Sequence, residues 1–351
     1  MATPADIVND DTETVFPYRH WWGLVGCAAI VALMILLGPY SEGIEFKPDK
    51  PVDWWYYWQL PDATIWTRLA AWVPYSLHQI SIWFLIAYAQ NQPTRPRYVF
   101  GLHKFNLWAL GINVFFILLH IAKTKVTYDG LAQDVHEATS MGSVTLMLFL
   151  IILMENRRRG LILGKPLKAL NLAGDVTRRY HGYYFPWAII YTFWYHPVEL
   201  TSGHLAGFAY MMLLILQSCL FFTRYHTNRW WTMFLETLFI IHGAMVAYTI
   251  MNQGVGPGWS HFVFGGIMTF LLCQMHGLGL STRAKWLIAA PPLAVMAFVF
   301  FTVPDSMGGS IRLTLIMFGG TLACALMVFG LIRFAELFGV DRDRLVSPAR
   351  G

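Results

Sequence analysis

The sequence predicts an all-α protein, a polytopic integral membrane helix bundle of about ten transmembrane helices with both termini in the cytoplasm. Three observations predict it. Apolar residues make up 56% of the 351 residues and charged residues only 13%, about half the charge of a soluble domain. The apolar residues come in runs of about twenty, the length that crosses a bilayer as a helix. Lysine and arginine collect in every second connection between these runs, which is the positive-inside pattern.

The apolar runs follow one another along the whole chain. We expect spans at 21–39, 65–90, 99–121, 136–154, 180–197, 203–223, 230–251, 259–280, 285–303 and 310–337. The first sixteen residues are polar and acidic, unlike a cleavable signal peptide, so the first run is expected to stay as a span. The expected organisation is a cytoplasmic N-terminal segment (1–20), a ten-helix transmembrane domain (21–338) and a cytoplasmic tail (339–351).

The charges of the connections indicate the direction of the helices. Basic residues follow the second, fourth, sixth, eighth and tenth runs: Arg95 and Arg97; Arg157, Arg158, Arg159, Lys165, Lys168, Arg178 and Arg179; Arg224 and Arg229; Arg283 and Lys285; Arg342, Arg344 and Arg350. The alternate connections are acidic or nearly neutral. All basic connections fall on one side only if there are ten spans, so the pattern supports both the number of spans and the cytoplasmic termini.

These charges also bear on location and partners. The net charge of +5 lies in short connections beside spans, which is an orientation signal rather than a nucleic-acid-binding patch. The expected partner is therefore the lipid bilayer and not nucleic acid. The expected location is the inner or plasma membrane of a bacterium, with many passes through it.

Three expected spans carry a histidine near each end, and these pairs predict a cofactor. The pairs are His103 with His120, His181 with His196, and His261 with His276. The last two pairs are separated by 15 residues, roughly 22 Å along a helix. At 100° per residue the two side chains of such a pair lie about 60° apart, so both can face the same neighbour. His103 and His120 lie about 100° apart and fit less well. Two layers of histidine on facing helices are what two b-type haems require as axial ligands, one haem in each leaflet.

This spacing resembles that of the two-haem b-type cytochromes of the ascorbate-reducible and ferric-reductase kind, which ligate haem through paired transmembrane histidines. The resemblance is limited to the spacing in two or three helices. It implies a membrane-embedded redox protein that holds haem b and moves electrons within or across the bilayer. Because the chain has no flavin-binding or nucleotide-binding motif, its electrons would come from quinol, a small reductant or a partner subunit.

A second interpretation is an outward-facing metalloenzyme that holds Cu, Zn or Fe. Seven residues that are expected near the outer surface have imidazole or carboxylate side chains: His120, His136, Glu137, His196, Glu199, His204 and His261. The segment 196–204 reads HPVELTSGH, a short turn that would hold three of them close together. Imidazole and carboxylate ligands suit these metals, and ligands on connections can leave a coordination position open.

A third interpretation is a proton-coupled transporter. Polar residues within the spans would line its path: His78, Gln79, Asn113, Gln217, Glu236 and His242. Glu236 and His242 are six residues apart and point about 120° away from each other, which argues against a direct pair. Pro74 and the Pro291-Pro292 pair would interrupt helices as in transporters. The three interpretations leave open whether the protein is an enzyme, and we predict no catalytic residue.

Overall fold

The computed structural model describes residues 15–38, 44–45, 59–251, 258–303 and 305–346, and in this part of the chain the protein is all-helical, as predicted. The long helices are α1 (His20–Leu37), α2 (Ile65–Gln90), α3 (Lys104–Val126), α4 (Glu137–Met154), α6 (Asn171–Tyr195), α7 (Ser202–Cys219), α8 (Arg229–Met251), α9 (Gly258–Leu272), α10 (Thr282–Thr302) and α11 (Ser306–Leu337). The short elements are α5 (Asn156–Arg159), α12 (Arg342–Val346) and the 3₁₀ turns η3 (Leu131–Gln133), η4 (Lys168–Leu170) and η5 (Gln274–Leu278).

Each predicted span overlaps one of the long helices, and eight of these helices are long and apolar enough to cross a membrane. The other two are α6, whose first ten residues are largely polar, and α9, which has only 15 residues. Large apolar side chains also cover the outside of the bundle, for example Phe301 (92% exposed), Leu337 (83%) and Trp66 (76%). Such a surface is stable in lipid and not in water. The protein is a polytopic membrane helix bundle.

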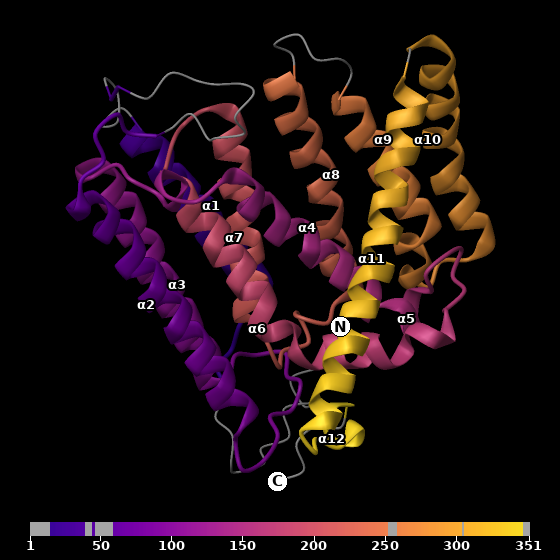
Figure 1. Cartoon of the computed structure of the whole chain (residues 1–351), viewed down its shortest axis with the longest axis horizontal. Coiled ribbons are helices and arrows are strands. Elements are labelled where there is room, and N and C mark those ends of the chain that lie inside the picture. Colours follow the sequence, from indigo (N-terminus) through magenta and orange to yellow (C-terminus); the bar gives the residue numbers. More distant parts are fainter. Residues whose placement is uncertain (1–14, 39–43, 46–58, 252–257, 304, 347–351) are drawn as a thin grey trace.

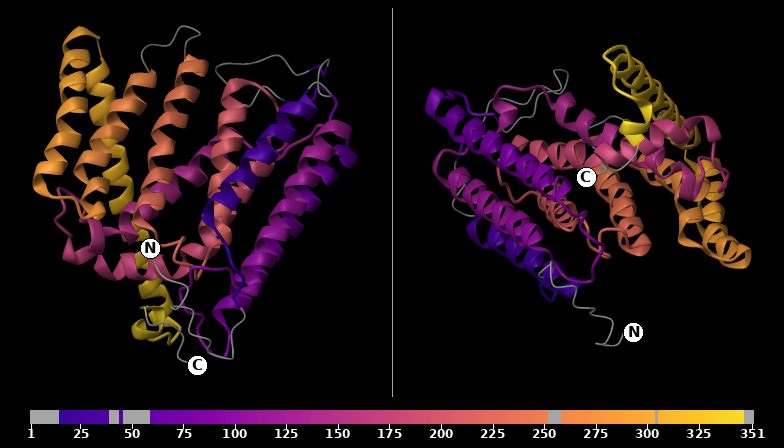
Figure 2. Two further views of the ribbon diagram at one scale, coloured as in Figure 1. Left: turned by 180° about the vertical axis from the view of Figure 1, so that it is seen from behind. Right: turned by 90° about the horizontal axis from the view of Figure 1, so that it is seen from below.

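The helices form two groups with α4 between them (Figures 1 and 2). In one group α2 packs on α3 and α6, and α7 packs on α1, α3 and α6. In the other group α9 packs on α8 and α11, with α10 beside them. The helix α4 packs on both α6 and α11, and α7 packs on α8. The core of the first group is centred on α6, where Phe193, Trp194 and Tyr195 are fully buried.

The connections fall alternately at the two ends of the bundle, and α5, η5 and α12 share the end with the basic connections (Figure 1). We name this end the basic end; the positive-inside rule assigns it to the cytoplasm. Of the predicted cytoplasmic segments, most of 1–20 lies outside the described residues, whereas 339–346 of the tail is described and includes α12.

Three predicted spans differ from the helices by five residues or more at one end or both. The helix α3 is shifted toward the C-terminus, because Asn106 accepts a hydrogen bond from the His103 backbone N–H (2.9 Å) and so caps the helix at Lys104. The helix α6 begins at Asn171, nine residues before its predicted start. The prediction of one continuous helix over 259–280 is wrong, since α9 ends at Leu272 and continues as the turn η5. The helical rotation that relates His261 to His276 in the sequence therefore does not apply.

Candidate functional site

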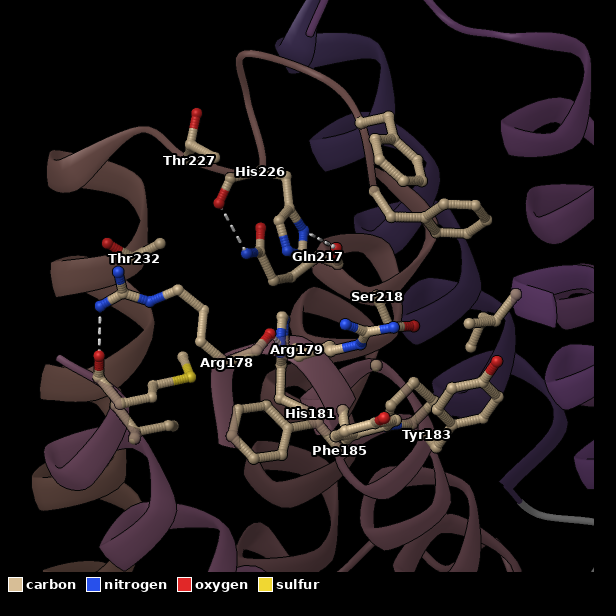
Figure 3. A pocket seen from close by; sticks show the side chains of 18 of the residues that line it. Arg178, Arg179, His181, Tyr183, Phe185, Gln217, Ser218, His226, Thr227 and Thr232 are labelled. Carbon is tan, nitrogen blue, oxygen red and sulfur yellow. Dashed lines mark hydrogen bonds between the residues drawn. The ribbon is translucent and has the colours of Figure 1, made fainter. Parts of the chain in front are cut away.

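A cavity of about 1550 Å³ opens at the basic end, larger than the roughly 300–1,000 Å³ of ordinary small-molecule pockets. Its walls are the ends of α2, α4, α6, α7 and α8 that lie at the basic end. The cavity therefore lies at the junction of the two helix groups. Figure 3 shows part of its lining at close range.

The mouth of the cavity is rich in arginine. Its lining includes six arginines against three carboxylates: Arg95, Arg158, Arg159, Arg178, Arg179 and Arg229, and Glu155, Asp175 and Glu236. Most of these residues come from connections or from the first turn of a helix. The excess of guanidinium groups gives the mouth a positive potential, which attracts anions.

Apolar side chains line the part of the cavity that extends toward the membrane interior. Met147, Ile189 and Leu214 are each more than one turn inside their helices, and Phe185 and Phe221 lie nearer the mouth. The cavity thus combines a cationic mouth with an apolar wall. This is the division of polarity that an amphiphilic ligand needs.

Two histidines from different elements meet in this cavity. His181 lies on α6 and His226 in the connection between α7 and α8; their ring centres are 6.1 Å apart, with an angle of 28° between the ring planes. The Nδ1 of His181 bonds with the Arg178 carbonyl (2.6 Å), and that of His226 with the Gln217 carbonyl (3.0 Å). A carbonyl only accepts, so both Nδ1 atoms carry hydrogen and both Nε2 atoms carry a lone pair. Both rings are half-buried and line the cavity, pointing toward one another in Figure 3.

Burial, together with the neighbouring His181, lowers the pKa of His226, which lies outside the spans, to about 4. The imidazole of His226 is therefore neutral at neutral pH, in agreement with its hydrogen bonds. Neutral imidazoles that donate one N–H to a backbone carbonyl are the form in which histidine binds metals.

A buried ion pair holds the wall of the cavity together. Arg159 of α5 donates two hydrogen bonds to Glu236 of α8, at 2.5 and 2.6 Å, and the two side chains are 2% and 7% exposed. Gln274 of η5 donates to the same carboxylate (3.1 Å). The forked geometry of guanidinium on carboxylate makes this a strong and directional contact. Glu236 thus pairs with an arginine at the basic end.

The residues of the predicted haem pairs are distributed over different interfaces. The helix α9 packs mainly on α8 and α11, whereas α6 packs mainly on α2, α4 and α7. His181 and His276, and likewise His196 and His261, therefore lie in or next to helices that have no extensive common interface. The ring of His261 lies against Gly309 of α11. Haem ligation remains a prediction, and of the predicted ligands the cavity includes His181.

The Nε2 atoms of three predicted ligands bond with backbone carbonyls, and these histidines link one segment to another. His103 bonds with the carbonyls of Arg97 (3.0 Å) and Phe222 (3.2 Å). His120 bonds with the His196 carbonyl (2.7 Å), which ties α3 to the end of α6. His276 of η5 bonds with the Leu271 carbonyl of α9 (3.2 Å). In each case Nε2 must be the donor, so it offers no lone pair to a metal.

The residues predicted to form an outer metal site lie in several separate places in the structure. His196 and His204 do meet, with ring centres 5.5 Å apart. His136 caps α4, where its Nδ1 accepts a hydrogen bond from the Ala138 N–H (3.1 Å), and Glu137 follows it in the first turn. Burial raises the pKa of Glu199, more than the nearby Tyr128 and Lys125 lower it. Within the described residues, no three or more His, Cys, Asp or Glu side chains are arranged to hold a metal ion.

Sequence reasoning missed two features of this site. His226 stands in a basic connection at the basic end, and no spacing relates it to His181, 45 positions earlier in the sequence. The partner of Glu236 was also missed. A carboxylate two turns inside a span, together with three successive arginines in an earlier connection, is a signal that indicates such a pair.

No protein-family model, curated protein or solved structure matches this chain. The interpretation of the site therefore depends on its own geometry and charge.

Proposed function

We propose that this protein binds an anionic amphiphile, a molecule with an apolar body and a negatively charged head, in the cavity at its basic end. The observation that carries the proposal is the combination, in one cavity of about 1550 Å³, of an arginine-rich mouth and an apolar wall. Because the basic end is assigned to the cytoplasm, the ligand enters from the cytoplasm or from the adjacent leaflet.

The charge of the mouth supports an anionic head. Arg159 is neutralised by Glu236, and Arg158 pairs with Glu155 (2.5 Å). Arg95 and Arg229 form no ion pair with any described residue, and both line the cavity. Guanidinium groups that keep their donors available are well suited to phosphate and carboxylate oxygens.

The apolar wall supports an amphiphile over a small hydrophilic anion. Side chains such as Ile86, Ile151 and Phe222 line the same cavity as the arginines, and covering them gains roughly 25 cal/mol per Å² of apolar surface. A soluble anion would leave this surface uncovered. An acyl chain or another apolar body would cover it.

The transporter interpretation is compatible with this site, since carriers bind their substrates in a cavity that opens to one side. Two residues that we assigned to a transport path, Gln217 and Glu236, do line the cavity. Proton coupling remains a prediction, as does a redox function that uses quinol or a partner subunit.

The proposal is tested by the binding of lauroyl lysophosphatidic acid to the purified protein, measured by thermophoresis below its critical micelle concentration. We expect binding to be much weaker for monolauroylglycerol, which lacks the charge, and for glycerol 3-phosphate, which lacks the chain. Equal affinity for the charged and uncharged lipids would contradict the proposal.

Substitutions at the mouth test whether its arginines bind the charged head. Arg95→Gln and Arg229→Gln should each weaken binding of lysophosphatidic acid about tenfold, the lower end of what a hydrogen bond to a charged group contributes. Lys104→Gln is the matched control, because Lys104 is a cation at the same end that packs over Trp108 (5.9 Å) outside the cavity. An unchanged affinity in both arginine variants would show that the mouth does not bind the head.

A further inference from the structure

The spacing of His181 and His226 is that of an axial pair. A metal ion binds an imidazole nitrogen at about 2 Å, so two imidazoles on opposite sides of one metal have their ring centres roughly 6 Å apart. The observed separation is 6.1 Å. The rings belong to separate elements and point toward one another across the cavity (Figure 3).

The hydrogen bonds of both rings prepare them for coordination. Each Nδ1–H is held by a backbone carbonyl, that of Arg178 for His181 and that of Gln217 for His226. This fixes the tautomer and the direction of each ring. The Gln217 side chain also donates to the His226 carbonyl (3.0 Å), which holds the connection in place. Among the described residues, the Nε2 atoms of the two rings have no hydrogen-bond partner.

The pair His181 and His226 is unsuited to two simpler ligands, an anion and a bare metal ion. The Nε2 lone pairs repel an anionic oxygen, so the pair does not belong to the site of the negatively charged head. A bare Zn²⁺ or Cu²⁺ ion needs three or four protein ligands, and in the described part of the chain no third His, Cys, Asp or Glu completes such a set. A metal that already has four planar ligands needs only the two axial ones.

We propose that the amphiphile of this cavity is an iron tetrapyrrole of the haem kind, with His181 and His226 as its two axial ligands. This inference rests on the proposed function, because a haem is an anionic amphiphile: its apolar ring would lie among Phe185 and Phe222, and its carboxylates would meet the arginines of the mouth. The inference keeps the predicted ligand His181 and replaces its expected partner at the same end of the bundle, His276 of η5, by His226.

The experiment is reconstitution of the purified protein with hemin, followed by optical spectra before and after reduction with dithionite. We expect the low-spin spectrum of a bis-imidazole haem with a sharp α band. His181→Ala and His226→Ala should each abolish the low-spin signal and weaken haem binding about tenfold or more. His276→Ala, which removes a predicted ligand outside the cavity, should leave the spectrum intact.

Loss of folding is separated from loss of a ligand by rescue. Free imidazole added to His226→Gly should restore the low-spin spectrum, since it fills the space left by the side chain. A spectrum unchanged in both alanine variants, or lost equally in His276→Ala, overturns the inference.

Metal-free protoporphyrin IX separates this inference from the proposed function. It has the ring and the carboxylates of haem but no iron, and its fluorescence reports binding. If protoporphyrin and lysophosphatidic acid bind while hemin shows no low-spin state, the axial pair is wrong and the proposed function stands. If neither protoporphyrin nor lysophosphatidic acid binds, both proposals fail.

Discussion

A buried charge in a membrane protein is stable only when its partner is equally well placed, and Arg159 and Glu236 meet this condition. Both side chains are almost fully buried, and two hydrogen bonds join them. Glu155 lies 3.4 Å from the Nε atom of Arg159. The pair connects the end of α4, through α5, to α8, which are neighbouring walls of the cavity. Its role is to fix the shape of the cavity.

Removal of one partner should therefore be far more harmful than removal of both. We expect Glu236→Leu to cost about 3–5 kcal/mol, because it leaves the Arg159 guanidinium buried and unpaired. The double variant Arg159→Met with Glu236→Leu should lose less than this single variant, as measured by thermal unfolding in detergent. Arg157→Gln is the control: its ion pair with Asp175 is exposed, and exposed pairs contribute little. A double variant less stable than Glu236→Leu would contradict this account.

The histidines show what can be predicted residue by residue. Of the two histidines that carry the present inference, sequence reasoning predicted His181 as a ligand and did not predict His226. What it could not supply was the direction of each ring nitrogen, since His103 and His120 bond with backbone carbonyls of distant segments. Such bonds depend on packing between elements, which spacing within one helix does not indicate.

At the scale of elements, hydropathy was sufficient to find the helices because a span has to be apolar over its whole length. The errors occur where this condition fails. The helix α6 starts early because its first ten residues lie at the basic end, where polar residues such as Asp175 are tolerated. The span over α9 was predicted too long because η5 contains no Lys, Arg, Asp or Glu that would mark the end of the helix, and only its contacts show the break. For example, Leu272 accepts a hydrogen bond from Leu163 (2.6 Å).

The interface of α9 with α11 depends on small residues. An added Cβ at Gly309 would overlap the ring of His261, and one at Gly265 would lie 2.8 Å from the Leu313 side chain. Close approach of helices through glycine is a common mode of packing in membranes.

This interface offers a matched pair of substitutions. Gly309→Ala should destabilise the protein by roughly 1–3 kcal/mol, the usual cost of overpacking. Gly308→Ala should be neutral or slightly stabilising, because a Cβ there meets nothing within 4 Å and alanine favours helix. Thermal unfolding of both variants in detergent is the measurement. Equal stabilities of the two variants would show that the contact with His261 is not tight.

At the scale of the whole molecule, the alternation of charge and the alternation of helix direction agree. The connections after α2, α4, α7 and α9 are basic and lie at one end together with α12. The positive-inside rule then orients the bundle as a unit. Eight apolar helices establish a multi-pass membrane protein, while a bacterial inner membrane as its location remains a prediction.

Reporter fusions test this orientation. A fusion at Lys165, in the connection after α5, should report a cytoplasmic location, and a fusion at Glu199, between α6 and α7, an extracytoplasmic one. Alkaline phosphatase and a fluorescent protein give opposite signals on the two sides, so each fusion is its own control. A cytoplasmic location for Glu199 would reverse the bundle and open the cavity to the outside.

The pairing of Arg159 with Glu236 also limits the order in which parts of the protein can form during its synthesis. The two residues are separated by 77 positions, so a ribosome that adds about 5–20 residues per second needs roughly 4 to 15 s between them. During this interval Glu236 has not yet been synthesised, so Arg159 of α5 cannot form its ion pair with α8. The wall that α5 and α8 share is therefore completed only after α8 has been synthesised. The cavity at the basic end therefore cannot take its final shape before at least 236 of the 351 residues have been synthesised.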